Sequence, residues 1–115
     1  MAGSIIITEN NHWSMGSSIY HWVAEFLIAN INDKEIAQKI QFIEDNNLQC
    51  IDFADFTPEQ QRKLTETLTT KLIPYAKRRI PLDYVSRRSR LDLLWELSAR
   101  AKFGAKWGEG NSPDI

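Results

Sequence analysis

The sequence lacks several features that would assign it to a particular class of protein. It has a single cysteine, Cys50, so no disulfide can form within the chain. No apolar run approaches the roughly 18–20 residues needed to cross a bilayer. The first residues also carry no basic segment ahead of the short apolar run Ile5–Ile7, as a secretory signal would. We therefore expect a cytoplasmic protein that has no membrane partner.

Motifs for metal binding and catalysis are also missing. The two histidines and Cys50 form no CxxC, HxxxH or HExxH pattern. His21 and Glu25 are one helical turn apart, which favours an ordinary polar pair over a small site. Gly16–Ser17–Ser18 matches neither a nucleophile elbow nor a phosphate-binding loop. The sequence thus predicts no metal, no cofactor and no catalytic residue, and favours a binding protein over an enzyme.

The composition is that of one globular domain. Of the 115 residues, 43% are hydrophobic and 25% are charged, which is enough apolar material for a core without disulfides or metals. We predict a compact, mainly α-helical single-domain bundle of four to five helices over residues 1–103. A flexible glycine-rich tail is expected over residues 104–115, and Ser4–Thr8 could form one short N-terminal strand.

Helical spacing of apolar residues begins at Ser18 and continues to Ile31. This segment is apolar on most sides, which predicts a central helix covered by others. Asn32 or Asp33 should cap a second helix that ends near Asp45. Residues 48–53 are expected to be extended, either as a strand or as a link.

The clearest local signal is the start of a third helix. Thr57 is an N-cap, Pro58 occupies the first helical position, and Gln60 completes a capping box. Pro74 should end or kink this helix. We expect residues 74–88 to be irregular, although Tyr75–Ile80 could hold a turn of helix, and a last helix capped by Ser86 or Ser89.

Charge is divided unevenly along the chain. Residues 1–56 carry a net charge of −6 and residues 57–115 carry +5, which together give the overall −1. Such a chain either neutralises itself internally or presents charged surfaces to a partner.

Acidic residues gather just before the third helix. The two phenylalanines of Asp52–Phe56 are expected in the core, and the neighbouring acids could cap a helix or form an acidic patch. The acids that would form this patch are Glu44, Asp45, Asp52 and Asp55. Trp13, outside the helical stripes, either folds onto the core or serves as an exposed interface anchor.

Basic residues gather later, between residues 71 and 90, where tyrosines are interleaved with them. Three interpretations remain open: pairing with the acids of the first half, binding of nucleic acid, or binding of an acidic protein surface. No RNA-binding signature motif accompanies them. The residues of this possible second surface are Arg78, Arg79, Arg87 and Arg88.

The segment IDFADFTPEQQRKLTETL, residues 51–68, resembles a passage of small bacterial immunity proteins. In those proteins an apolar–Asp–Phe step is followed by Thr-Pro-Glu-Gln and a leucine-striped helix. The chain is similar in plan to the immunity partners of contact-dependent growth inhibition and related polymorphic toxin systems. The resemblance implies a protein that binds one cognate C-terminal toxin domain, often a nuclease, and blocks it with an acidic face. A small nucleic-acid-binding protein that uses residues 71–90 is the alternative.

Overall fold

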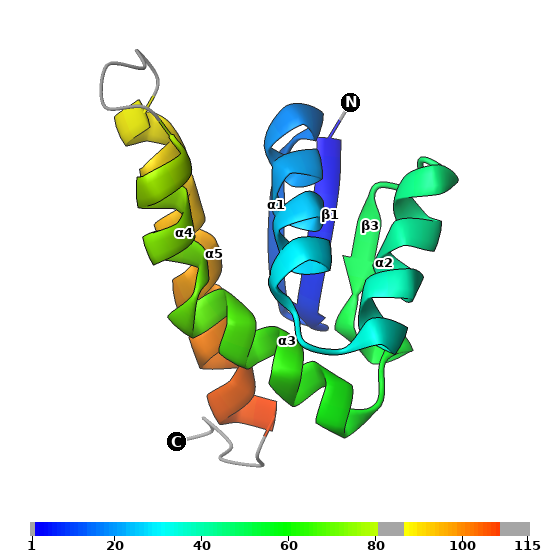
Figure 1. Cartoon of the computed structure of the whole chain (residues 1–115). Coiled ribbons are helices and arrows are strands. Elements are labelled where there is room, and N and C mark those ends of the chain that lie inside the picture. The colour runs from blue at the N-terminus through cyan, green and yellow to red at the C-terminus, as the bar shows by residue number, and fades with distance from the viewer. Residues whose placement is uncertain (1, 81–86, 109–115) are drawn as a thin grey trace.

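The computed structural model describes residues 2–80 and 87–108, which form five α-helices, one short 3-10 helix and a three-stranded sheet (Figure 1). In chain order the elements are β1 Ala2–Thr8, β2 Asn11–Gly16, α1 Ser17–Asn30, α2 Lys34–Asp45, β3 Cys50–Asp52, η1 Phe53–Asp55, α3 Pro58–Thr70, α4 Leu72–Arg79 and α5 Arg87–Gly108. The prediction of a mainly helical protein is confirmed. The sheet is larger than the single short strand that was expected.

The sheet begins with a hairpin. β1 and β2 pair antiparallel, with Ile5 opposite Trp13, and β3 joins the other side of β1 in parallel, with Ile51 beside Ile5. The sequence predicted the first strand but not β2, because His12 to Gly16 lacks the β-branched residues typical of strands. All three of these paired apolar side chains are buried, so they mark the face of the sheet that meets the core.

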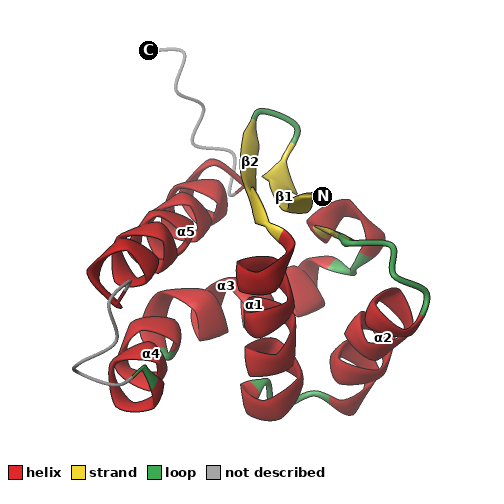
Figure 2. Ribbon diagram, turned by 90° about the horizontal axis from the view of Figure 1, so that it is seen from above, coloured by secondary structure: helices red, strands yellow, loops and turns green. Residues whose placement is uncertain are grey.

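The helices pack on that inner face. Figure 2 shows β1 and β2 at one margin of the molecule, with α1 and α5 beside them, and both helices contact both strands. The opposite face carries polar residues such as Ser4 and Ser14, whose hydroxyls lie 3.2 Å apart. This alternation of buried and polar side chains is typical of a sheet covered on one side. The architecture is therefore helices on a small mixed sheet, rather than a bundle of helices alone.

Helix α1 is central, as its composition predicted. Tyr20, Val23 and Leu27 are fully buried, and the helix contacts α2, α3, β1 and β2. It also approaches β1 very closely. A Cβ atom added to Gly3 would lie only 2.1 Å from Cγ of Tyr20, so glycine is required where β1 passes over this ring.

The third helix begins as predicted. The Thr57 hydroxyl accepts a hydrogen bond from the Gln60 backbone N–H, and the Gln60 side chain accepts one from the Thr57 N–H. Beyond this helix, α4 covers residues 74–79 of the segment expected to be irregular, so the turn of helix considered for Tyr75–Ile80 is part of a longer helix. Pro74 lies in the first turn of α4, where its missing N–H leaves no helical hydrogen bond unmade.

The last helix, α5, begins at Arg87 and continues to Gly108, past Phe103 where the flexible tail was expected to begin. Ser86, one of the two caps proposed for it, and the rest of the expected tail lie outside the described residues. Among the described residues, no helix is both long and apolar enough to cross a membrane.

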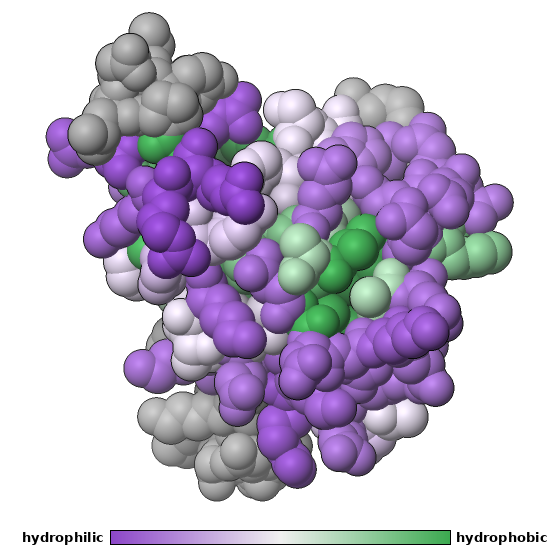
Figure 3. Space-filling view, in the orientation of Figure 1, coloured by the Kyte–Doolittle hydropathy of each residue, from purple (hydrophilic) through white to green (hydrophobic). Residues whose placement is uncertain are grey.

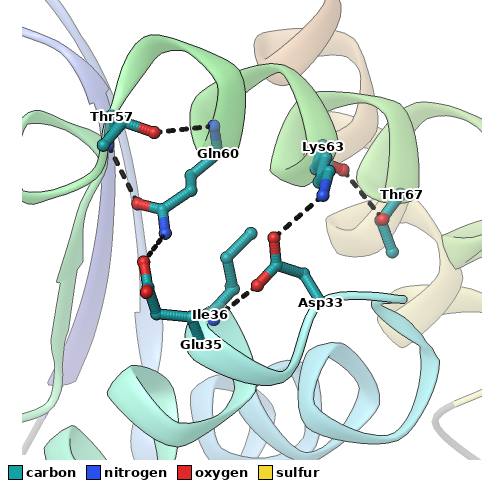
Figure 4. Close-up of polar contacts among 7 residues, drawn as sticks. All are labelled: Asp33, Glu35, Ile36, Thr57, Gln60, Lys63 and Thr67. Carbon is teal, nitrogen blue, oxygen red and sulfur yellow. Dashed lines mark hydrogen bonds and ion pairs between the residues drawn. The ribbon is translucent and has the colours of Figure 1, made fainter.

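A polar network joins the N-terminal ends of α2 and α3 (Figure 4). Asp33 accepts a hydrogen bond from the Ile36 N–H at 3.1 Å and forms an ion pair with Lys63 at 3.0 Å. The side-chain amide of Gln60 donates to the Glu35 carboxylate across the same junction. Asp33 caps α2 and pairs with Lys63 of α3, while Gln60 of the α3 capping box contacts Glu35 of α2. These contacts fix the position of α2 relative to α3.

Candidate partner-binding surfaces

The four acids predicted to form one patch have different environments. Glu44 is turned inward: its side chain is 14% exposed, and its Oε2 lies 2.7 Å from Nδ1 of His21. This contact links the end of α2 to α1. His21 therefore pairs with Glu44 and not with Glu25, the partner that sequence spacing suggested, and Glu44 is not an open carboxylate on the surface.

The remaining three acids divide between capping and exposure. Asp52 is half-buried and accepts a hydrogen bond from the Ala54 N–H at 2.9 Å, so it caps η1. Asp45 is exposed on α2, where it accepts a hydrogen bond from Gln41 at 2.8 Å. Asp55 is exposed as well, and its backbone carbonyl accepts a hydrogen bond from the Lys39 ammonium. Asp45 and Asp55 thus keep their carboxylates at the surface.

Trp13 is a core residue, so the interpretation of this residue as an exposed anchor is wrong. Its side chain is 1% exposed, and its indole Nε1 donates a hydrogen bond to the Leu93 carbonyl at 3.1 Å. Asn11, two residues earlier on β2, donates in the same way to the Arg100 carbonyl at 2.7 Å. Both contacts attach the hairpin to α5.

Sequence reasoning missed the exposed apolar side chains. Phe42 is 61% exposed and Leu48 is 56% exposed, and they lie in the last turns of α2 and in the turn that follows it. A third, Trp95, is 52% exposed on α5. Phe42 could have been noticed, because it falls outside the apolar stripe formed by Ile36 and Ile40.

Apolar atoms also reach the surface between α1 and α2. Figure 3 shows green atoms in this region, enclosed by hydrophilic residues, in the orientation of Figure 1. Ile28 of α1 and Ala37 of α2 are only partly buried against the core. We give the name α2 surface to a different set, the exposed residues Phe42, Asp45 and Leu48 at and just after the C-terminal end of α2.

Some polar side-chain atoms are buried without a partner among the described residues. Within the described part of the chain, the Tyr20 hydroxyl, Glu44 Oε1 and Gln49 Oε1 are buried and have no hydrogen-bond partner. Burial, with a smaller contribution from the nearby charge of Glu44, raises the pKa of Tyr20. Burial also raises the pKa of Cys50, which keeps it a thiol at neutral pH rather than an activated nucleophile. Among the described residues, no group of three acids, histidines or cysteines could hold a metal ion.

A second surface lies at the end where α4 and α5 meet (Figure 1). The last turn of α4 and the first residues of α5 carry its bases. We call them the basic end: Lys77, Arg78, Arg79, Arg87 and Arg88.

Among the described residues, few side-chain contacts involve the basic end. Arg87 donates hydrogen bonds to the carbonyls of Ile80 and Lys77, at 3.2 and 3.4 Å, so it caps the C-terminus of α4. Arg79 lies over the Tyr75 ring, 5.0 Å from its centroid. The ion pairs found within residues 2–80 and 87–108 are His21–Glu44, Asp33–Lys63 and Glu96–Arg100, and none of them involves the basic end. In this part of the chain, the acids of the first half do not neutralise these bases.

No family model, curated protein or solved structure matches this chain. Its function must therefore be argued from its own two surfaces.

Proposed function

We propose that this protein neutralises a cognate toxin domain by binding it stoichiometrically through the α2 surface. The observation that carries the proposal is the joint exposure of Phe42 and Leu48 beside the Asp45 carboxylate. An aromatic and an aliphatic side chain flanked by charge is the composition of an interface centre with a polar rim.

Burial of these side chains would supply most of the affinity. Each large apolar side chain that leaves water contributes about 1.5–3 kcal/mol. Phe42 stands on a helix whose N-terminus is fixed to α3 through Asp33 and Lys63 and whose last turn is fixed to α1 through Glu44. Little backbone ordering is then needed on binding, which favours tight association.

Exposed acids of the first half of the chain favour a basic partner. They are Asp45 on α2, Asp55 and, on the neighbouring α1, Glu25, and they outnumber Lys39, the exposed base of α2 that bonds the Asp55 carbonyl. A nuclease domain needs a basic surface to hold its substrate, and an acidic surface would be steered toward it. Occupation of that basic surface would exclude the nucleic acid.

The test uses the C-terminal domain encoded by the gene immediately upstream of this one. That domain should arrest growth of a bacterial host when expressed alone, and co-expression of this chain should restore growth. Phe42→Ala with Leu48→Ala should weaken the purified complex by at least tenfold in calorimetry, and Asp45→Lys should slow association. Trp95→Ala is the matched control, because it removes an aromatic side chain of similar exposure from α5.

Restored growth with no complex, or equal losses in the Phe42 and Trp95 variants, would remove the α2 surface from the mechanism. An upstream domain that is harmless to the host would reject toxin neutralisation itself.

A further inference from the structure

The helix dipole accounts for only some of the positive charges of the basic end. Lys77, Arg78 and Arg79 lie in the last turn of α4, where positive charge is favoured by the helix dipole. Arg88 lies at the opposite kind of terminus, in the first turn of α5, which contains no acidic residue. A cation there opposes the dipole, so stability of the helix does not account for it.

An aromatic group adjoins these charges. Trp22 of α1 and Tyr75 of α4 are half-buried, with ring centroids 5.7 Å apart, and Tyr75 also contacts Phe26 at 5.0 Å. Arg79 is exposed but is held over the Tyr75 ring. Partly open rings beside guanidinium groups provide surfaces on which planar bases can stack.

We propose that the basic end, together with Tyr75 and Trp22, binds single-stranded nucleic acid. Arg78, Arg79 and Arg88 contact successive phosphates, and a base stacks against the Arg79–Tyr75 pair. Four of the five basic residues of the basic end are arginines, whose planar guanidinium group matches the geometry of a phosphate. An acidic protein would also pair with arginines, but it would not make use of the half-buried rings of Trp22 and Tyr75.

This surface is separate from the one proposed to bind a toxin. In Figures 1 and 2, α4 and α5 lie on one side of α1 and α2 lies on the other. Substitutions at the basic end can therefore be made without touching Phe42, Asp45 or Leu48. The two proposals can fail independently.

The direct test is fluorescence anisotropy with a fluorescein-labelled 20-nucleotide oligouridine. If Arg78, Arg79 and Arg88 contact phosphates, the affinity of the wild-type protein should fall about twentyfold between 50 and 200 mM salt. Arg78→Gln, Arg79→Gln and Arg88→Gln together should weaken binding at 50 mM salt by at least tenfold. They should also reduce the slope of log affinity against log salt by about 2.

The matched control removes the same charge elsewhere. Lys34→Gln, Arg62→Gln and Lys102→Gln alter three exposed bases outside the basic end, and this variant should bind nearly as the wild type does. Tyr75→Leu should lose about tenfold in affinity while Tyr75→Phe retains it, because only the ring is needed for stacking. Circular dichroism establishes that each variant is folded.

Three results would overturn the proposal. The first is the absence of wild-type binding at 50 mM salt, where phosphate contacts are strong. The second is an equal loss in the two triple variants, which would indicate nonspecific attraction. The third is equal affinity for a poly-glutamate peptide with no effect of Tyr75→Leu, which would assign the surface to an acidic protein.

Discussion

Replacing Gly3 with alanine should destabilise the protein, because β1 and α1 leave no room for a methyl group. The new Cβ would lie 2.1, 2.5 and 2.6 Å from Cγ, Cβ and Cδ1 of Tyr20. Relief would require these atoms to retreat by about 0.9–1.4 Å, since carbon atoms pack at roughly 3.5–4.0 Å. Two of them are the root of a fully buried side chain, so a rotamer change cannot provide the space and α1 itself must shift.

Overpacking of this kind costs about 1–3 kcal/mol. Alanine also restricts the unfolded chain, which returns about 0.4–1 kcal/mol. The overlap with three atoms places the cost in the upper part of this range, so the net loss is about 1–2.6 kcal/mol, which for a domain of this size lowers the Tm by about 4–11 °C. Differential scanning calorimetry measures the Tm, and urea denaturation measures the free energy of unfolding.

Gly16→Ala is the matched control. Among the described residues, nothing lies within 4 Å of a Cβ at Gly16, which precedes α1 at its N-cap position. Alanine is a poorer cap than glycine but restricts the unfolded chain, so the two effects should nearly cancel. A Tm for Gly3→Ala within 1 or 2 °C of the wild type, or equal to that of Gly16→Ala, would refute the close packing of β1 on Tyr20.

Three further substitutions or titrations test single groups. Tyr20→Phe should leave the free energy of unfolding unchanged or raise it, because the buried hydroxyl has no hydrogen-bond partner among the described residues; a loss above about 1 kcal/mol would reveal one. The hydrogen bond from the Ile36 N–H and then the Lys63 ammonium lower the pKa of Asp33 from its ordinary value of 3.8, so its contribution to stability is present above that pH and is lost as the pH falls through the lower folded value. Asp33→Asn keeps the cap, so the free energy of unfolding from urea denaturation should fall less between pH 5 and pH 2 than in the wild type. An equal fall in both proteins would contradict the pairing of Asp33 with Lys63. Cys50 should react with a disulfide reagent at pH 8 at least tenfold more slowly in the folded than in the urea-unfolded protein, because burial raises its pKa; equal rates would show an accessible thiolate.

Local chemistry was predictable from the sequence, and long-range pairing was not. The capping box of Thr57 and Gln60 depends on neighbouring residues, and it forms as predicted. The parallel pairing of Ile5 with Ile51 joins distant segments, and no local pattern encodes it. Pro74 was expected to end or kink the third helix. It instead lies in the first turn of α4, where proline is tolerated, and only the position at which α4 begins decides this.

The same distinction applies to the candidate sites. The composition indicated charged surfaces, and Asp45 and Asp55 are exposed. It could not indicate that Glu44 turns toward His21, since that contact depends on how α1 and α2 pack. The exposure of Phe42 likewise depends on which side of α2 meets the core.

The bond from Trp13 to Leu93 has a consequence for synthesis of the protein. The first strands emerge from the ribosome long before α5 exists, and the indole of Trp13 acquires its partner only when residues near the C-terminus are available. Until then a nascent chain carries a hairpin that α1 covers only in part, and such exposed strand surface is what chaperones bind. Closure of the core must therefore wait until Leu93 has left the ribosome, and a stop codon ahead of Leu93 would yield a product that cannot close its core.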